Sequence, residues 1–167
     1  MNRKIRLANS NDVSAIAEIA VKCFPQDYIS MNSKLDKNEV SRNWIEKHLL
    51  MEPFGFITVA EQDNKVVGFG LYFMIGGLSG VMHAEQIAVD PNFQRKGIGS
   101  NLMIESENIL KDYLLLNLDT KLKKIVLTTS SENPSSHDLY KKQGYKLVAN
   151  LGEMFFSGDE IMYEKVI

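Results

Sequence analysis

Cysteine is almost absent from this sequence, and the single residue, Cys23, excludes any disulfide within the chain. A catalytic thiol needs an activating neighbour in space, which the sequence does not show, so we expect Cys23 to be a buried helix residue. Histidine is scarce too: the three residues lack the spacing of a metal site, and no paired cysteines accompany them. We therefore predict a cytoplasmic protein that needs no metal.

The sequence also lacks an excess of either charge, with 19 Lys and Arg against 21 Asp and Glu. This balance argues against general nucleic-acid binding, which requires a basic surface. The longest uncharged stretch, Val66–Met82, is too short and too rich in glycine for a membrane-spanning helix. The N-terminal segment Met1–Arg6 lacks the apolar core of a signal peptide. We therefore expect neither nucleic acid nor membrane as a partner.

The chain length of 167 residues fits one domain, residues 1–167, with a substantial core. Apolar periodicity predicts an α/β fold in which strands first pair as a meander and then alternate with helices, forming a mixed sheet covered on both faces. The expected strands are Lys4–Leu7, Phe56–Glu61, Lys65–Met74, Val81–Val89, Lys124–Thr128, Tyr145–Asn150 and Glu160–Val166.

Capping residues and periodicity predict the helices between these strands. Two helices are expected after the capping residues Asn9 and Asp36, and another begins at Pro134. The longest helix is expected from Ile98 to about Leu116. Its inward-facing residues are predicted to be Leu102, Ile109, Tyr113 and Leu116.

The segment Asp90–Gly99 joins an apolar run, Ile87–Val89, to the start of this long helix. Its glycines let backbone N–H groups turn inward, and the helix start adds unpaired N–H groups and the positive end of its dipole. Arg95 and Lys96 add full charges beside them. The segment therefore predicts an anion site suited to a pyrophosphate. The alternative is a tight turn whose glycines serve only packing.

Two other nucleotide-binding motifs do not fit this spacing. A Walker-type loop carries its lysine after the last glycine, whereas Lys96 precedes Gly97. A dinucleotide fingerprint requires a third glycine in the first βαβ unit. Here Asn101 and Leu102 follow Gly99, and the segment lies past the middle of the chain.

Two segments resemble one protein family. Gln94-x-x-Gly97-x-Gly99 is similar to the Gln/Arg-x-x-Gly-x-Gly/Ala signature of the GNAT superfamily of N-acyltransferases, in which this turn binds the pyrophosphate of acetyl-CoA. The segment Asn133–Tyr145 resembles the family's Asn-x-x-Ala-x-x-Leu-Tyr-x-x-x-Gly-Phe, with Ser136 in place of the alanine. The predicted order of strands and helices is also that of the family, so the resemblance covers nearly the whole chain.

The resemblance implies a single-domain fold: a mixed sheet of six to seven strands, flanked by about four helices and splayed at the cofactor site. It implies an N-acetyltransferase that moves an acetyl group from acetyl-CoA to a primary amine, by direct transfer in a ternary complex. The implied cofactor-binding residues are Ile87, Ala88, Val89, Gln94, Arg95, Lys96, Gly97, Ile98, Gly99, Ser100, Asn133 and Tyr140. For Asn133, a role as a helix cap alone is the alternative.

Tyr140 is implied as the general acid for the leaving thiolate. A free tyrosine has a pKa of about 10 and a thiol one of about 8.5, so proton transfer becomes feasible when the thiolate is desolvated. Otherwise the phenol only donates a hydrogen bond, which still stabilises the leaving group. The alternative is a core aromatic residue.

The base is expected on the strand Val81–Val89, where His83, Glu85, Ile87 and Val89 share one face because side chains alternate along a strand with a period of two. An alkyl ammonium has a pKa of about 10.4, so a base must remove its proton. Glu85 is the first candidate, directly or through water, and His83 is the second. Glu85 as an orienting group, or both residues facing solvent, are the alternatives. The oxyanion is expected to meet the backbone N–H of Ile87.

The acceptor is expected between residues 24–36 and 152–158, which carry acids and aromatic residues. Acids suit a small cationic amine such as a polyamine or an aminoglycoside, and a protein amine fits almost as well. Two other functions remain open: a non-catalytic CoA-binding or sensing module, and an acyltransferase that uses another acyl-CoA. Dimers are common in the family, which leaves a homodimer open.

Overall fold

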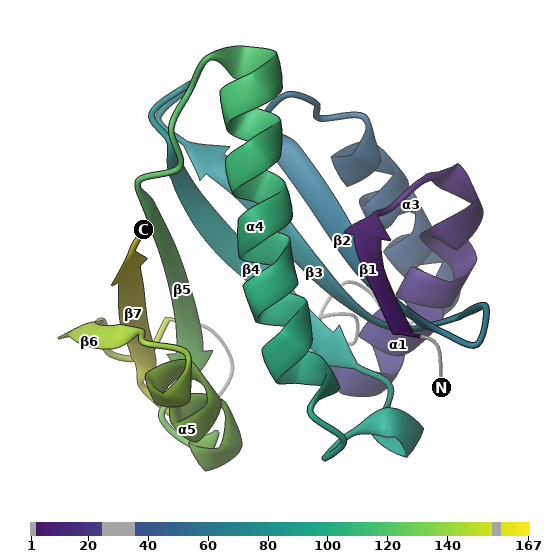
Figure 1. The fold of residues 1–167 in the computed structure, drawn as a ribbon. Coiled ribbons are helices and arrows are strands. Elements are labelled where there is room, and N and C mark those ends of the chain that lie inside the picture. Colours follow the sequence, from purple (N-terminus) through teal and green to yellow (C-terminus); the bar gives the residue numbers. More distant parts are fainter. Residues whose placement is uncertain (1–2, 25–35, 155–157) are drawn as a thin grey trace.

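The computed structural model describes residues 3–24, 36–154 and 158–167, which contain one seven-stranded sheet in the order β1-β2-β3-β4-β5-β7-β6. The strands are β1 Arg3–Leu7, β2 Gly55–Gln62, β3 Lys65–Ile75, β4 Val81–Val89, β5 Lys124–Ser130, β6 Lys146–Asn150 and β7 Glu160–Val166. The helices are α1 Val13–Cys23, α3 Lys37–Leu49, α4 Ile98–Leu118 and α5 Pro134–Lys142. Figure 1 shows α4 and α5 on one face of the sheet and α1 and α3 on the other. The predicted mixed α/β sheet with helices on both faces is confirmed.

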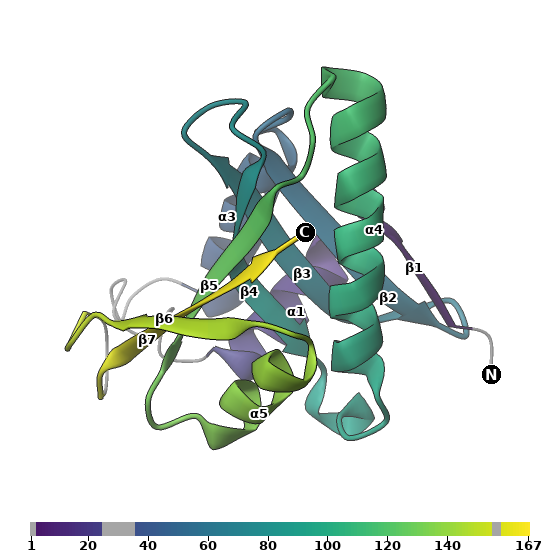
Figure 2. The ribbon, with the colours of Figure 1, turned by 60° about the vertical axis from the view of Figure 1, so that its left-hand side comes forward.

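The sheet divides between β4 and β5. These two strands form its parallel pair, and their pairing covers only Val81–Ala84 against Lys124–Leu127. Beyond this short seam β4 continues to Val89 and β5 to Ser130 without pairing to each other. Figures 1 and 2 show the two strands diverging toward the end at which α5 lies. The predicted splay of the sheet is therefore confirmed, and it leaves one side of β4 without a strand neighbour.

A β-bulge divides β4 into two parts. In the pairing with β3, Leu71 lies opposite Gln86 and Tyr72 lies opposite Ala84, so that Glu85 has no partner on β3. An extra residue on one strand reverses the faces to which the following side chains point. Even-numbered residues of β4 consequently face α4 before the bulge, and odd-numbered residues face α4 after it.

The inward face of α4 differs from the prediction at one end. Every fourth residue is buried, at Leu102, Ser106, Leu110 and Leu114, whereas Leu116 is 80% exposed. The predicted inward position of Leu116 is therefore wrong. The reason is Ser106, a polar residue at the centre of the buried face, which conceals the true stripe in the sequence. Its hydroxyl is 2.6 Å from the hydroxyl of Thr58, so it is satisfied inside the core.

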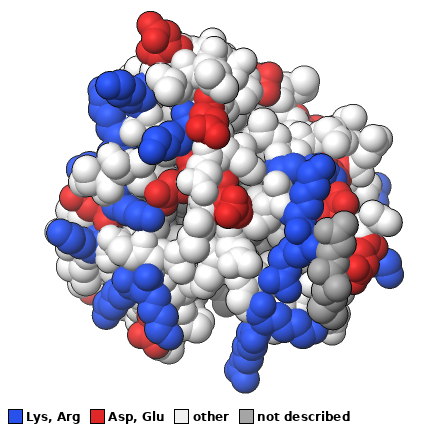
Figure 3. All heavy atoms as spheres, in the orientation of Figure 1, with Lys and Arg blue, Asp and Glu red and all other residues white. Residues whose placement is uncertain are grey.

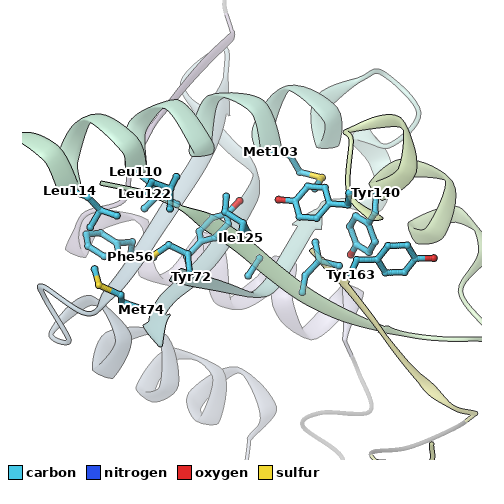
Figure 4. Close-up of a cluster of buried hydrophobic side chains, with 14 of the residues drawn as sticks. Phe56, Tyr72, Met74, Met103, Leu110, Leu114, Leu122, Ile125, Tyr140 and Tyr163 are labelled. Atoms are coloured by element: carbon cyan, nitrogen blue, oxygen red, sulfur yellow. The ribbon is translucent and has the colours of Figure 1, made fainter. Parts of the chain in front are cut away.

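The main core lies between α4 and the sheet and extends to α5. Figure 4 shows Leu110 and Leu114 of α4 beside Phe56 and Tyr72, with Tyr140 and other aromatic residues at the opposite end of the cluster. A second cluster joins α1 and α3 to the other face. None of the helices within the described parts of the chain has both the length and the apolar character needed to cross a membrane.

A salt bridge fixes the connection from β1 to α1. Both nitrogens of the Arg6 fork donate to the Asp12 carboxylate, at 2.7 and 2.9 Å. The same carboxylate accepts from the backbone N–H of Asn9 at 2.8 Å, which completes a capping box. The hydrogen bonds from Arg6 lower the pKa of Asp12 below its ordinary value, although burial acts in the opposite direction. The pair therefore couples the fold to pH.

We expect Asp12→Asn to lower the free energy of unfolding at pH 7 by about 2 to 3 kcal/mol, because it removes one member of a largely buried pair. The folded pKa of Asp12 lies below the unfolded value of about 3.9, so this stabilisation is present above that pH and disappears as pH falls through the folded pKa. Urea unfolding at a series of pH values measures it, with the exposed Asp112→Asn as control. A deficit that stays constant from pH 7 to about pH 2 would contradict this assignment.

Candidate functional site

The segment between β4 and α4 is held at both of its ends. Asp90 accepts from the backbone N–H of Asn92 at 2.9 Å and so caps the short 3-10 turn Pro91–Phe93. Its other carboxylate oxygen lies 2.8 Å from the ammonium of Lys22, at the end of α1. The side-chain amide of Gln94 donates to the carbonyl of Val89 at 2.9 Å. The segment is therefore anchored to α1 and β4 before it reaches the glycines.

The backbone of this segment presents N–H groups at the start of α4. Arg95 and Gly97 both adopt positive φ, at 59° and 74°, which turns the chain sharply into the helix. The first helical hydrogen bond runs from Asn101 to the carbonyl of Gly97 at 3.1 Å. The N–H groups of residues 98–100 therefore have no partner within the helix, at the positive end of a long helix dipole. This is the anion-binding geometry that the sequence predicts.

Helix α5 lies against this turn. A Cβ atom built on Gly99 would be 3.8 Å from Leu139 of α5 and 3.8 Å from Val89, so the helix start, β4 and α5 meet there. Arg95 and Lys96 add basic side chains to the turn itself, whereas Lys141 of α5 lines a depression beside β6 and β7. Figure 3 shows such side chains at the lower edge of the molecule, where Figure 1 places the turn and α5. The anion site therefore combines the positive end of the α4 dipole with the full charges of Arg95 and Lys96 on the turn.

The backbone of β4 faces the gap at alternate residues. The N–H of Asp90 donates to Val67 of β3 at 2.9 Å, which means that the peptide groups of Ala88 also point to β3. Those of Ile87 and Val89 consequently point into the gap between β4 and β5. The Val89 carbonyl already accepts from Gln94 and from the thiol of Cys23, the latter at 3.4 Å. The N–H and C=O of Ile87 and the N–H of Val89 are thus the groups placed for an extended ligand.

Tyr140 lies on α5 and closes the far side of this gap. Its side chain is buried and belongs to the cluster against which Ile87 packs. Burial raises the pKa of Tyr140 above its ordinary value, and a hydrogen bond with Ser136 offsets part of that shift. The phenol therefore keeps its proton throughout the neutral range. Ile87 thus packs against the cluster that contains Tyr140, and the neighbouring residue Leu139 lies beside Gly99 of the glycine turn.

Asn133 is a helix cap in this structure. Its side-chain oxygen accepts from the backbone N–H of Ser136 at 3.3 Å and from the hydroxyl of Ser135 at 2.9 Å. With the oxygen used in this way, the group that Asn133 can offer to a cofactor is its amide N–H.

The prediction that alternate residues of β4 share one face from His83 to Val89 is wrong. Ile87 and Val89 pack on the side of α4. His83 instead contacts Phe73, with the rings tilted by 40° and their centroids 5.3 Å apart, on the side of α1 and α3. The bulge at Glu85 is the physical reason, because it reverses the alternation between the two pairs.

His83 and Glu85 form a pair of their own. The imidazole Nδ1 lies 3.2 Å from a carboxylate oxygen of Glu85. The Glu85 side chain is 39% exposed and that of His83 is 19% exposed, so solvent and small molecules reach the carboxylate first. Tyr140 and this pair therefore approach the gap from opposite faces of the sheet.

Some parts of the site were not predicted, and others are not described. The Lys22–Asp90 pair and the bulge at Glu85 escaped prediction; only the Asp90-Pro91 dipeptide marks a local turn in the sequence. Most of the predicted acceptor loops, residues 25–35 and 155–157, lie outside the described residues. Across the ranges that the structure describes, no three His, Cys, Asp or Glu side chains are grouped to hold a metal ion.

Comparison with known proteins identifies the family. The model of the Acetyltransferase (GNAT) family matches residues 13–145. Ribosomal-protein-alanine N-acetyltransferase from Brucella melitensis is 21% identical, with a TM-score of 0.75 over 98% of this chain and 99% of that one. PaiA N-acetyltransferase from Thermoplasma acidophilum, solved with coenzyme A, is 21% identical, with a TM-score of 0.69 over 100% of both chains. Mutant forms of the spermidine/spermine N-acetyltransferase SpeG from Vibrio cholerae are 20% identical, with a TM-score of 0.71 over 99% and 95%. These structures share the fold, and the family match spans most of the sequence, so the chain belongs to the acetyltransferase (GNAT) family and is an acyltransferase.

Proposed function

We propose that this acyltransferase moves an acetyl group from acetyl-CoA to a primary amine by direct transfer in a ternary complex. The observation that carries the proposal is the gap between β4 and β5, which opens beside the glycine turn at the start of α4. An extended pantetheine chain fits such a gap because it can bond to the free side of β4. The pyrophosphate then meets the N–H groups of residues 98–100 and the charges of Arg95 and Lys96.

The proposed base and the proposed acid approach the thioester from opposite faces of the sheet. The amine nitrogen attacks the thioester carbonyl carbon, an N–C bond forms, and the C–S bond breaks. Glu85 takes the proton of the amine, directly, through water or through its partner His83. Tyr140 donates to the departing sulfur from the other face, and the N–H of Ile87 stabilises the oxyanion. The reversal of faces at the bulge thus separates base and acid on either side of the thioester.

The acceptor enters from the face of α1 and α3, where the carboxylate of Glu85 is exposed. A carboxylate at the point of attack favours an ammonium substrate over a neutral one. Among the structural relatives, one is named for ribosomal-protein alanine and one for spermidine and spermine, so both protein and polyamine acceptors occur on this fold. We propose a small cationic amine as acceptor, with a protein amine as the alternative.

A thiol-release assay tests the function. Acetyl-CoA is incubated with a panel of polyamines, aminoglycosides, amino acids and peptides with free N-termini, and the free thiol is measured. Release that depends on one amine class supports the proposal and names the acceptor. Succinyl-CoA and longer acyl-CoA donors, run in parallel, show whether acetyl is the preferred group. Binding of acetyl-CoA without release by any amine would instead support a sensing module.

We expect Gly97→Ala to weaken acetyl-CoA binding about tenfold, because a side chain disfavours φ of 74° and withdraws N–H groups from the phosphates. Gly77→Ala is the matched control. Gly77 also has positive φ, at 66°, and a Cβ added to either glycine would meet no atom within 4 Å, but Gly77 lies in the β3–β4 loop. Both variants should lose similar stability, and only Gly97→Ala should lose affinity in isothermal titration calorimetry. Equal affinities would remove this turn from the binding site.

A further inference from the structure

A hydrogen bond outside the proposed machinery ties α5 to the neighbouring strand. The imidazole Nδ1 of His137 lies 2.8 Å from the hydroxyl of Tyr163 on β7. Their rings also contact each other at a tilt of 48°, with centroids 5.7 Å apart. Tyr163 is 1% exposed, so its hydroxyl depends on a protein partner. None of the steps proposed above uses either residue.

This bond acts on the helical turn that carries Tyr140. His137 and Tyr140 are three residues apart on α5, so their side chains lie on one face of the helix. Tyr163 also touches Tyr140 directly, with ring centroids 5.9 Å apart. Figure 4 shows the labelled side chains of Tyr140 and Tyr163 side by side at one end of the cluster. Tyr163 therefore contacts the ring of Tyr140 and, through His137, also holds the helix that carries Tyr140.

Packing on the outer side of α5 does little to replace this contact. A shallow depression of about 390 Å³ lies on the outer side of α5 beside β6 and β7, and His137, Leu147 and Tyr163 are among its lining residues. Leu147 of β6 is itself 60% exposed there. The core contacts of Leu139 and Tyr140 are non-directional, so the His137–Tyr163 hydrogen bond supplies the directional contact that sets the tilt of this nine-residue helix.

We propose that His137 and Tyr163 are positioning residues that hold the Tyr140 hydroxyl at the departing sulfur. This inference rests on the proposed function, since it assigns Tyr140 a reacting thiol. The pair itself touches neither substrate nor coenzyme. A displacement of about 1 Å at a reacting group can cost about 10²-fold in rate, which sets the upper limit of the effect to look for.

A double-mutant cycle with Tyr140 tests the proposal. We expect Tyr163→Phe to lower kcat about fivefold to twentyfold with KM for acetyl-CoA unchanged, because it removes the bond to His137 and keeps the ring. In the Tyr140→Phe background the same change should lower kcat by less than about twofold. A purely structural role would reduce activity by the same factor in both backgrounds, and that result would overturn the proposal.

Two substitutions of His137 test whether a polar side chain at this position is enough to preserve kcat. His137→Asn keeps a polar group near the position of Nδ1 and should retain most of the wild-type kcat, whereas His137→Leu should match Tyr163→Phe. Tyr113→Phe, on the far half of α4, is the control for loss of a tyrosine hydroxyl and should leave kcat unchanged. Equal effects of the Asn and Leu variants would contradict a role for the hydrogen bond.

A binding measurement gives a readout that needs no acceptor. Wild-type protein should bind coenzyme A several-fold more tightly than desulfo-coenzyme A, which lacks the thiol, and both Tyr140→Phe and Tyr163→Phe should lose this preference. A preference that Tyr163→Phe retains would overturn the inference and leave the proposed function standing. If wild-type protein binds neither ligand and releases no thiol, both the proposed function and this inference are wrong.

Discussion

Replacing Tyr140 by phenylalanine is expected to lower kcat by about 10²- to 10³-fold, the usual cost of removing one hydrogen-bond donor from a developing negative charge. The ring stays, so its contacts with Tyr145 and Tyr163, at centroid distances of 6.1 and 5.9 Å, are preserved. Affinity for acetyl-CoA should change by less than about twofold, because the donor acts on the leaving sulfur rather than on the bound thioester. Initial rates and titration calorimetry measure the two quantities separately.

The effect depends on where Tyr140 is buried. The same burial that raises the pKa of Tyr140 also strips water from a neighbouring thiolate, which raises the thiol's pKa and makes it a better proton acceptor. Donor and acceptor are thus shifted in the same direction. A Tyr140→Phe enzyme with unchanged kcat would show that the thiolate departs without assistance. A variant that loses acetyl-CoA affinity and stability together would show a role in packing alone.

Gly80→Ala is expected to destabilise the fold by about 3 kcal/mol or more, from left-handed backbone strain and from overpacking. A Cβ at Gly80 would lie only 2.1 Å from the carbonyl oxygen of Lys121, and its φ is 76°. The carbonyl of Gly80 accepts from Lys123 at 2.8 Å, directly before the paired residues of β4 and β5. The substitution therefore pushes apart the short seam that joins the two halves of the sheet.

Urea unfolding of Gly80→Ala beside Gly77→Ala separates the two contributions. Gly77 has a similar φ and open space around it, so its substitution should cost about 1 kcal/mol from backbone strain alone. The remaining difference is the cost of moving Lys121. Equal losses in the two variants would show that the segment before β5 shifts freely and that the seam does not depend on this close approach.

Short-range sequence patterns were enough to predict much of the fold. β4 was predicted with its observed bounds, Val81–Val89, because a glycine loop precedes it and an Asp-Pro pair follows it. The caps at Asn9, Asp36 and Asn133 are all present, since a capping side chain bonds to backbone only two or three residues away. The glycine turn and its helix belong to the same class of short-range pattern.

The misplaced features depend on contacts that the sequence does not show locally. The bulge at Glu85 is set by the register between β3 and β4, which involves Gly68 and Gly70 opposite Val89 and Ile87. These glycines leave room that a side chain would fill; a Cβ on Gly70 would lie 2.7 Å from the ring of Tyr72. The His137–Tyr163 bond likewise joins residues 26 positions apart. The alternation of side chains along one strand predicts neither the bulge nor this hydrogen bond.

The gap between β4 and β5 has a further consequence for handling the protein. Strand edges without a partner are templates on which a second chain can pair and begin to aggregate. Most sheets have two such edges at their margins, whereas this one has additional unpaired backbone in its interior, beyond the Ala84–Leu127 pair. The side chains of Gln94 and Cys23 already donate hydrogen bonds to the carbonyl of Val89, so this carbonyl is not open to a second chain. A bound coenzyme would cover the remaining unpaired backbone, so we expect self-association to be faster in coenzyme-free preparations than in coenzyme-bound ones.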